Sequence, residues 1–203
     1  MNRLRKLPWK LRYVYGERMA SRFRRRMLLL TNMHADVRIA KNTRLGPGFR
    51  LYMPEGGAFI VHPGCDFRRD FVCEIYGGGT VEVGAGTTFT SSAFLQITTR
   101  LTIHPRSAFG QATQIVDGNH RWRDPDVHMF DQGYDYTPLE MGPGAMVFSK
   151  CTVFASLGER AIVGANSLVS KPVPPYCFAA GSPARVIEYY GRPENRPEGL
   201  EVG

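Results

Sequence analysis

Residues 80–103 read TVEVGAGTTFTSSAFLQITTRLTI, and the spacing of apolar residues in this stretch decides the fold. Val83, Phe89, Leu95 and Leu101 stand six positions apart. Helical packing repeats about every 3.6 residues and a simple strand about every 2, so neither explains this period. A period of six with small residues after the apolar one is typical of a hexapeptide repeat.

The same period continues on both sides of this stretch, with slips between runs. Its further members are Ile39, Leu45 and Leu51; Val61, Phe67 and Cys73; Ile103, Phe109 and Ile115; Met141, Val147 and Val153; and Leu157, Val163 and Val169. Each hexapeptide supplies a short strand and a turn, and three of them form one triangular coil. We therefore expect an all-β solenoid, a parallel β-helix of about six coils over residues 37–187. Cys65, Cys73 and Cys151 fall at inward positions, where core packing explains them.

One segment breaks this rhythm, residues 117–138, which read DGNHRWRDPDVHMFDQGYDYTP. A solenoid accommodates such an insertion only as a loop that projects from one coil. Long loops in compact domains are usually functional or disordered. Because this one carries Trp122, Phe130 and Tyr134, we expect it to pack against another surface.

Residues 1–36 form a separate basic segment. The chain has a net charge of +8, and residues 1–26 alone hold ten Lys or Arg and one acid, Glu17. We expect a helix over residues 4–30, with a break near Pro8 or Gly16. The apolar residues that could share one face of it are Leu4, Leu7, Leu11, Val14, Phe23, Met27 and Leu30. We favour a helix that covers the end of the core over a basic face for lipid, nucleic acid or CoA phosphates. We expect no nucleic-acid partner, and contact of the basic N-terminus with a membrane surface stays open as the less favoured alternative.

The composition points to a soluble enzyme-sized domain. Hydrophobic content is 43% and charged content 22%, both ordinary for a globular protein. The longest strongly apolar run, residues 27–30, is far short of a membrane span, and no cleavage site follows it. The four cysteines form no CxxC pair, so a reducing cytoplasm is the simplest compartment and no metal site is expected.

Residues 157–187, LGERAIVGANSLVSKPVPPYCFAAGSPARVI, closely resemble the C-terminal signature of the hexapeptide-repeat acyltransferases. Three pieces carry the resemblance: VGANSLVSK at 163–171, the Pro174-Pro175 pair, and GSPARVI at 181–187. It implies a left-handed parallel β-helix that forms a homotrimer, with acyl-CoA in a groove between two β-helices. Residues 188–203 would then be a C-terminal tail.

The resemblance also implies a catalytic base. In this family it is the His of an Asn-His pair in the projecting loop, which corresponds to Asn119-His120. A neutral imidazole can take the proton of a sugar hydroxyl as its oxygen attacks a thioester carbon. Asp117 could orient His120 by accepting a hydrogen bond from its other ring nitrogen.

Family members contact CoA from small residues and backbone of the last coils. By resemblance these positions are Ser149, Ala165 and Ser170 in this sequence. Lys171 and Arg185 match basic positions that meet the CoA phosphates. The alternative for both is an exposed, solvated side chain.

The acyl group is left open between acetyl and succinyl. Acetyl is the usual cargo of the family, and Phe148 would narrow the thioester path in its favour. Arg121 and Arg123 follow the Asn-His pair directly, and a guanidinium can bind the free carboxylate of a succinyl donor. In the competing interpretation the two arginines pair with Asp124 and Asp126 and hold the loop.

Other functions remain beside an O-acyltransferase acting on a sugar or polysaccharide. An N-acyltransferase acting on an amino sugar or antibiotic needs the same base and the same CoA groove. A zinc enzyme on this fold would need three histidine ligands, and His104, His120 and His128 lack the expected spacing. A purely binding scaffold would not need the Asn-His loop together with the CoA signature. The Arg-rich N-terminus is similar to that of actinobacterial glycan acyltransferases.

Overall fold

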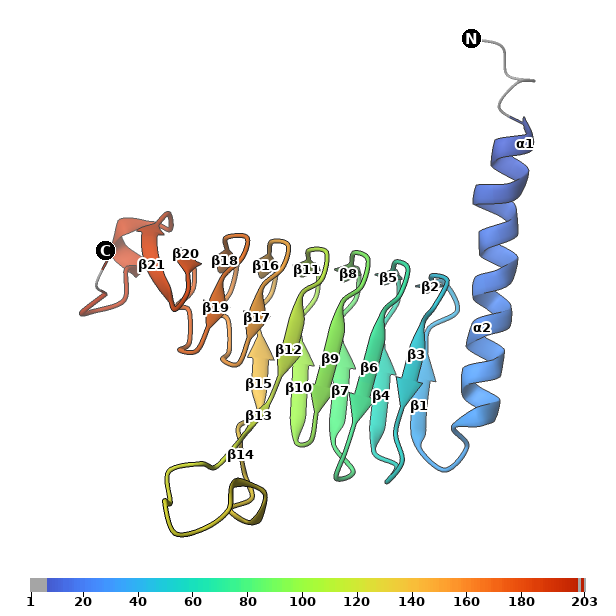
Figure 1. Ribbon diagram of the computed structural model, residues 1–203. Helices are drawn as coiled ribbons and strands as arrows, with labels where there is room; N and C mark the ends of the chain where they lie inside the picture. The colour runs from blue at the N-terminus through green and yellow to red at the C-terminus, as the bar shows by residue number, and fades with distance from the viewer. Residues whose placement is uncertain (1–6, 201, 203) are drawn as a thin grey trace.

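The computed structural model describes residues 7–200 and 202, and they form a parallel β-helix with a helix across its first coil and a loop projecting from its side (Figure 1). Three parallel sheets make the faces of the prism. This arrangement fits the left-handed β-helix expected from the period of six.

The first sheet contains β1 (Asp36–Ile39), β4 (Ala58–Val61), β7 (Thr80–Val83), β10 (Arg100–Ile103) and β15 (Leu139–Met141). The second contains β2 (Arg44–Leu45), β5 (Asp66–Phe67), β8 (Thr88–Phe89), β11 (Ala108–Phe109), β16 (Met146–Val147), β18 (Ile162–Val163) and β20 (Cys177–Gly181), with β21 (Ala184–Tyr189) antiparallel at its edge. The third contains β3 (Arg50–Tyr52), β6 (Val72–Ile75), β9 (Phe94–Ile97), β12 (Gln114–Val116), β17 (Thr152–Val153) and β19 (Leu168–Val169). A short helical turn, η4 (Pro193–Asn195), follows β21.

The coils differ in length along the prism. Leu45 pairs with Phe67 and Phe67 with Phe89, so the first coils repeat every 22 residues. Val147 pairs with Val163 sixteen residues later. Three hexapeptides would give 18 residues in every coil, so the expected coil length is too short for the first coils and too long for the last ones. The physical reason is that strands such as β4 and β6 have four residues in the wide coils, whereas β17 and β19 have two in the narrow ones.

The core follows this taper. In the wide coils, the rings of Phe67 and Phe89 stack at 5.3 Å between centroids, and those of Phe89 and Phe109 at 4.6 Å. In the narrow coils, the same stack continues through Val147 and Val163. Smaller side chains fit there because a shorter coil encloses less volume, and interiors are filled at nearly constant density.

The inward cysteines are confirmed. Cys65, Cys73 and Cys151 are buried, as is Cys177, and all four are free thiols. Burial raises the pKa of the Cys73 thiol far above its ordinary value, so this side chain is neutral and acts as a small apolar core residue.

The N-terminal helix is continuous through the expected break. α1 (Leu7–Lys10) passes into a π-helical stretch, η2 (Leu11–Gly16), and then into α2 (Glu17–Thr31). Gly16 therefore marks a change of helix type and no interruption. The expected residues 4–6 lie outside the described part of the chain. None of the described helices is long and apolar enough to cross a membrane.

The helix covers the end of the core, as expected, but through the opposite face. The Ser21 hydroxyl accepts a hydrogen bond from Leu45 N at 2.9 Å, and Arg24 Nη1 donates to Leu45 O at 2.6 Å. Leu28 packs beside them against the core. Of the described residues expected on the buried face, Leu7, Leu11, Phe23, Met27 and Leu30 are exposed, and Val14 is half-buried. The first coil offers unpaired backbone groups at its end, and polar side chains satisfy these better than apolar ones.

Candidate active site

The projecting loop is a β-hairpin closed by a short helical turn. It leaves the prism after β12 and returns at β15 (Figure 1). Its two strands, β13 (Gly118–His120) and β14 (Tyr134–Tyr136), pair antiparallel, and the turn is η3 (Met129–Asp131). The Gln132 side chain ties the loop together by donating to Asp124 O and Val127 O at 2.9 and 2.7 Å. The loop is thus an ordered platform for the side chains on β13.

Asp117 anchors the base of this hairpin. Its buried carboxylate accepts hydrogen bonds from Thr98 N, Thr99 N and Thr99 Oγ1, at 2.6 to 3.0 Å. These partners belong to the turn between β9 and β10 in the preceding coil. The expected hydrogen bond to His120 is not made, because Thr98 and Thr99 occupy the carboxylate. Asp117 is therefore a structural anchor of the loop in this structure.

His120 is held by aromatic packing. Its ring lies against Tyr134, its cross-strand partner, at 4.2 Å between ring centroids, and 6.0 Å from Phe130. Its Nδ1 atom is buried and has no hydrogen-bond partner among the described residues. The ring is half-exposed, so the other side of the imidazole can face the space beside the loop.

A cleft of about 460 Å³ lies between the hairpin and the prism. Its lining includes five of the residues expected in the site: Asp117, Asn119, His120, Arg121 and Arg123. Trp122, Asp124, Gln132, Asp135, Thr137 and Phe154 complete it. The loop thus brings the proposed base and both arginines to one concave surface, where small-molecule sites are usually found.

The two arginines have different surroundings. Arg121 Nε donates to Asp135 Oδ1 at 2.6 Å across the hairpin. The guanidinium of Arg123 lies over the Trp122 ring, 5.1 Å from its centroid, and pairs with no carboxylate within residues 7–200 and 202. The alternative pairing of these arginines with Asp124 and Asp126 does not occur among the described residues, where Asp124 Oδ1 accepts from Asp126 N within its own turn.

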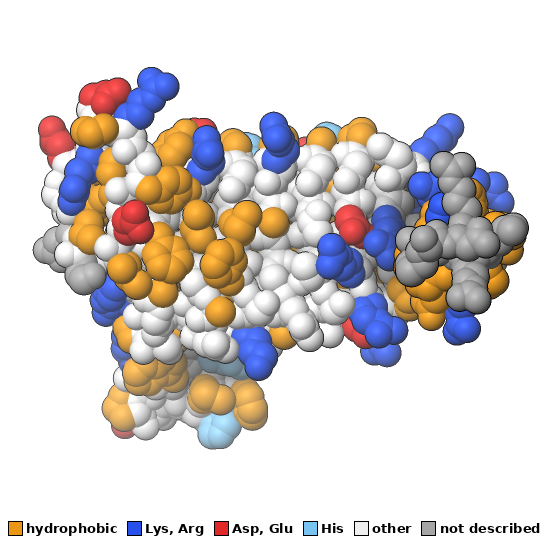
Figure 2. Space-filling model, turned by 90° about the horizontal axis from the view of Figure 1, so that it is seen from above, with side chains coloured by type: hydrophobic (Ala, Val, Ile, Leu, Met, Phe, Trp, Pro, Cys, Tyr) orange, Lys and Arg blue, Asp and Glu red, His pale blue; other side chains and the backbone are white. Residues whose placement is uncertain are grey.

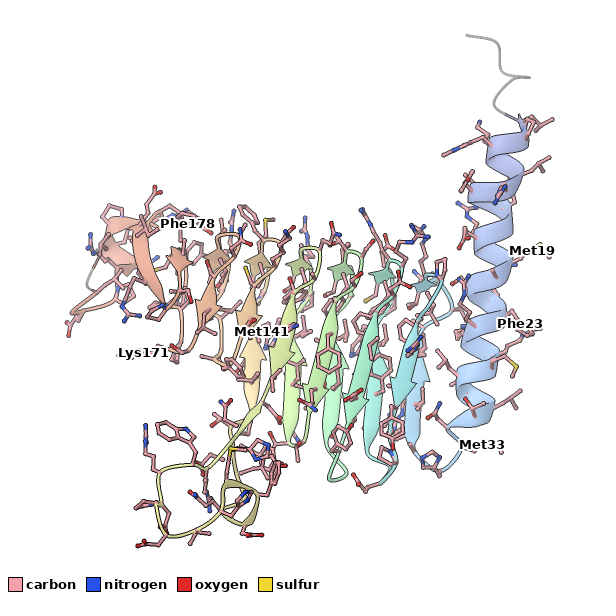
Figure 3. The ribbon with its side chains drawn as sticks, viewed as in Figure 1. Met19, Phe23, Met33, Met141, Lys171 and Phe178 are labelled. Atoms are coloured by element: carbon pink, nitrogen blue, oxygen red, sulfur yellow. The ribbon has the colours of Figure 1, made fainter. Side chains whose placement is uncertain are left out.

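The expected CoA residues lie on the narrow coils, outside the cleft lining. Ser149 and Ala165 occupy the same corner in successive coils, where Asn166 N donates to Ser149 O. Ser170 and Lys171 follow β19 at the other edge of the third sheet, one coil beyond the cleft residue Phe154, whose N–H donates to Val169 O. Figure 3 shows Lys171 at the edge from which the hairpin projects. Arg185 is exposed on β21, and its Nη1 donates to Ala184 O.

Two contributors were missed in the sequence. Tyr134 fixes the His120 ring, and Phe154 supplies the prism side of the cleft. The aromatic content of the loop predicted that Tyr134 packs against something, but it did not identify His120 as the partner. Nothing in the sequence singled out Phe154, because it directly follows the strand β17 and resembles other residues that follow strands at this edge of the prism.

The three histidines considered for zinc occupy separate settings. His104 Nε2 lies 2.6 Å from Glu140 Oε1 on the first sheet, and His128 Nδ1 accepts from Phe130 N in the hairpin. No group of three or more His, Cys, Asp or Glu side chains able to hold a metal occurs in the described part of the chain.

Comparison with curated proteins finds acetyltransferases. A probable acetyltransferase of Mycobacterium tuberculosis is 30% identical over 76 residues, 36% of this chain and 25% of that protein. The galactoside O-acetyltransferase of Escherichia coli is 26% identical over 179 residues, 87% of this chain and 74% of that protein. The serine acetyltransferase of Escherichia coli is 29% identical over 128 residues, 53% of this chain and 44% of that protein. The match spans less than half the length of the first and third of these relatives. No protein-family model matches the chain.

Comparison with solved structures finds the same architecture. A hexapeptide-repeat acetyltransferase of Vibrio cholerae in complex with acetyl coenzyme A has a TM-score of 0.52 and 19% identity, covering 72% of this chain and 73% of that one. A galactoside acetyltransferase in complex with coenzyme A has a TM-score of 0.50 and 16% identity, covering 91% and 88%. A mutant N-acyltransferase of Bacillus cereus in complex with dTDP and coenzyme A has a TM-score of 0.50 and 16% identity, covering 73% and 84%. At these identities the likeness establishes the fold. In sequence and in fold, the chain resembles the hexapeptide-repeat acetyltransferases.

Proposed function

We propose that the chain is an acyl-CoA-dependent O-acyltransferase that moves a short acyl group to a hydroxyl of a sugar or polysaccharide. The observation that supports this most is the cleft that joins Asn119 and His120 to the arginines beside the narrow coils. The relatives that resemble the chain are acetyltransferases, and three similar structures hold coenzyme A or its acetyl ester. The four free cysteines favour a reducing, cytoplasmic compartment.

In this proposal His120 is the general base. Its imidazole takes the proton of the acceptor hydroxyl while the hydroxyl oxygen forms a bond to the thioester carbon. Collapse of the tetrahedral intermediate breaks the carbon–sulfur bond, and the imidazolium returns its proton to the departing thiolate. Tyr134 packs against the ring, tilted by 39°, and restricts its orientation, which favours catalysis by reducing the freedom lost on reaching the transition state.

The direct test is transfer by the purified chain. Mass spectrometry of candidate glycans incubated with acetyl-CoA or succinyl-CoA, and then freed of the donor, should show the mass of one acyl group, released as a hydroxamate by alkaline hydroxylamine. Absence of any acylated product across a broad acceptor set, with CoA bound normally, would reject the proposal. An acyl group on an amine resists hydroxylamine, which identifies the second candidate, an N-acyltransferase acting on an amino sugar. The likeness to an N-acyltransferase fold keeps that candidate in view.

The two arginines differ as candidates for binding the free carboxylate of a dicarboxylic donor. Arg121 is already paired with Asp135, whereas Arg123 has no carboxylate partner among the described residues. We propose Arg123 as the residue that would bind the carboxylate of a succinyl donor. Arg123→Ala should then lower kcat/KM for succinyl-CoA by about 10- to 150-fold more than for acetyl-CoA, the loss of a charged hydrogen bond. Arg121→Ala is the matched control and should affect both donors equally; equal effects from Arg123→Ala would leave acetyl as the donor.

We propose that Ser149, Ala165 and Ser170 line the path of the CoA arm and that Lys171 and Arg185 meet its phosphates. Both basic side chains are exposed, so their contribution should be modest and sensitive to salt. The double Ala variant should raise the donor KM more than it lowers kcat, and added salt should reduce the difference. A donor KM that is unchanged at all salt concentrations would remove both residues from the site.

We also propose a homotrimer in which the hairpin reaches toward a neighbouring protomer. A cyclic trimer places each site at a contact between unlike surfaces, which closes into a ring. The aromatic side chains Trp122 and Phe130 are exposed on the single chain, and such a contact would cover them. Light scattering that shows only monomer would contradict the shared site.

A further inference from the structure

The outer face of the N-terminal helix carries a continuous apolar stripe. Met19 is 71% exposed and Phe23 64% exposed. Leu11, Tyr15, Met27 and Leu30 are also exposed and lie on the same side of the helix as these two residues, at turn-by-turn spacing. Figure 3 shows Met19, Phe23 and Met33 directed away from the prism. Most exposed apolar side chains of soluble proteins are scattered singly, and a contiguous stripe marks an interaction surface.

The stripe cannot turn inward without breaking the contact that holds the helix. Ser21 and Arg24 bind the backbone of Leu45 on the opposite side, and Leu28 packs on the core beside them. The orientation of the helix is therefore fixed by the first coil.

Basic side chains flank the stripe. Arg18, Arg22 and Arg26 follow one side of it at turn-by-turn spacing, and all three are exposed. Arg18 and Arg22 stand at the margin nearer the prism, where they also line a groove between the helix and the first coils. Figure 2, which views the helix end-on, shows apolar and basic side chains exposed together around it. The single acid of α2, Glu17, lies 3.6 Å from Arg24 on the inner side. The stripe is thus bordered along one side by cationic groups, and no acid of the described helix lies on its outer face.

This charge selects the occupant. A second copy of the helix would bring two sets of arginines together, and like charges in contact oppose association. An anionic lipid surface accepts the apolar side chains between its headgroups and pairs its phosphates with the arginines. We propose that the outer face of the helix binds the surface of a membrane that contains anionic lipid. This reverses the expectation from the sequence, which placed the apolar residues against the core.

The direction of the stripe suits a flat surface. The helix lies across the end of the prism, and its outer face points along the axis of the β-helix (Figure 1). If the protein forms the proposed trimer of parallel β-helices, three stripes face the same side, and their binding is cooperative because they are linked. This last step rests on the proposed trimer, whereas the membrane contact of one helix does not.

The test is sedimentation of the full chain with vesicles, without acyl donor. Vesicles of phosphatidylcholine containing about one third phosphatidylglycerol should bind the protein, and vesicles of phosphatidylcholine alone should bind it at least tenfold more weakly, as expected for an electrostatic contribution of about fivefold per basic residue. Met19→Ser with Phe23→Ser should weaken binding to the anionic vesicles by about 100-fold, since two large apolar side chains lose their burial. Tyr52→Ser, which removes an exposed aromatic ring from the third sheet, is the matched control and should bind like the wild type.

A second set of variants tests the charge. Arg18→Gln, Arg22→Gln and Arg26→Gln together should weaken binding by about 100-fold, at about fivefold per basic residue near the surface. Arg50→Gln, Arg69→Gln and Arg100→Gln remove three exposed cations from the coils and should have little effect.

Two outcomes would overturn the proposal. One is failure of the wild-type chain to bind anionic vesicles. The other is binding of the Met19→Ser, Phe23→Ser variant to anionic vesicles as strongly as the wild type. If light scattering then shows that this variant forms a smaller assembly than the wild type, the stripe is an interface between copies of the chain. Neither outcome bears on acyl transfer, which is measured separately on soluble acceptors.

Discussion

The coils and the hairpin both contain aromatic residues, but these side chains are buried in the coils and largely exposed in the hairpin. In the coils, Phe67, Phe89 and Phe109 are fully buried and stack on one another through the prism. In the hairpin, Phe130 and Tyr134 are exposed or lie beside His120, and the polar groups around them face a cleft.

This difference separates stability from chemistry. A buried ring in the coils contributes by removing apolar surface from water and filling volume. An aromatic ring in the hairpin contributes by orienting a polar neighbour that must remain accessible to a substrate. Changes in the coils should therefore alter the free energy of unfolding, and changes in the hairpin should alter turnover.

His120→Ala has the largest expected effect on turnover and gives the clearest test that the hairpin controls turnover and not stability. His120→Ala should lower kcat by about 100- to 10,000-fold, the usual loss when a general base is removed, while thermal unfolding and CoA binding stay unchanged. His128→Ala is the matched control, since His128 lies in the same hairpin and its Nδ1 accepts a hydrogen bond from Phe130 N. Turnover above half of the wild type in the purified His120→Ala protein would exclude this residue as the base.

Phe89 tests the other side of the comparison. Phe89→Ala should lower the free energy of unfolding by about 3–5 kcal/mol, because it leaves a cavity between two stacked rings. Denaturant titration followed by circular dichroism measures this loss. Phe130→Ala, a change in an exposed ring of the hairpin, should alter the same free energy by less than about 0.5 kcal/mol. Equal losses for the two variants would show that the hairpin is part of the cooperative core.

Asp117 sharpens the comparison at the junction of the two regions. Asp117→Asn should cost about 1.5–3 kcal/mol of stability, since the buried carboxylate accepts from Thr98 and Thr99. The pH dependence of kcat/KM should keep its shape, because Asp117 does not contact His120 in this structure. A shift of the pH profile without a loss of stability would return Asp117 to the role of orienting the base.

Tyr134 gives the smallest effect. Tyr134→Leu removes the ring that lies 4.2 Å from the His120 ring, between centroids, and keeps an apolar side chain there. An aromatic contact of this kind is worth about 0.5–1.5 kcal/mol, so kcat should fall by about two- to tenfold. Tyr136→Leu, the neighbour that stacks on Tyr134, is the control and should have less effect on kcat. If Tyr136→Leu lowered kcat more than Tyr134→Leu, the aromatic packing would support the hairpin as a whole and would not act on His120 through Tyr134 alone.

The sequence predicted the coils well and the contacts of the site poorly. The period of six identified many of the inward residues and the parallel sheets, because both depend on spacing along a single repeat, but it missed others, such as Phe59 and Ile75. It did not predict the change from 22 to 16 residues per coil, since the longer strands carry a second inward apolar residue, such as Phe59 or Ile75, that lies outside the six-residue register. It placed Asp117 beside His120 on adjacency, and missed Thr98 in the coil below.

The sequence by itself determined the repeating core, the projecting loop with its Asn119-His120 pair, and the basic character of the N-terminus. These are local properties, set by side chains a few positions apart. Only the tertiary structure decided which face of the helix meets the prism, which acid pairs with Arg121, and which arginine stays without a carboxylate partner among the described residues. Those outcomes depend on groups that are distant in the chain, such as Ser21 and Leu45, and on which buried polar atoms must be satisfied. No spacing rule encodes them, because they follow from how the coil ends and the hairpin fit together in space.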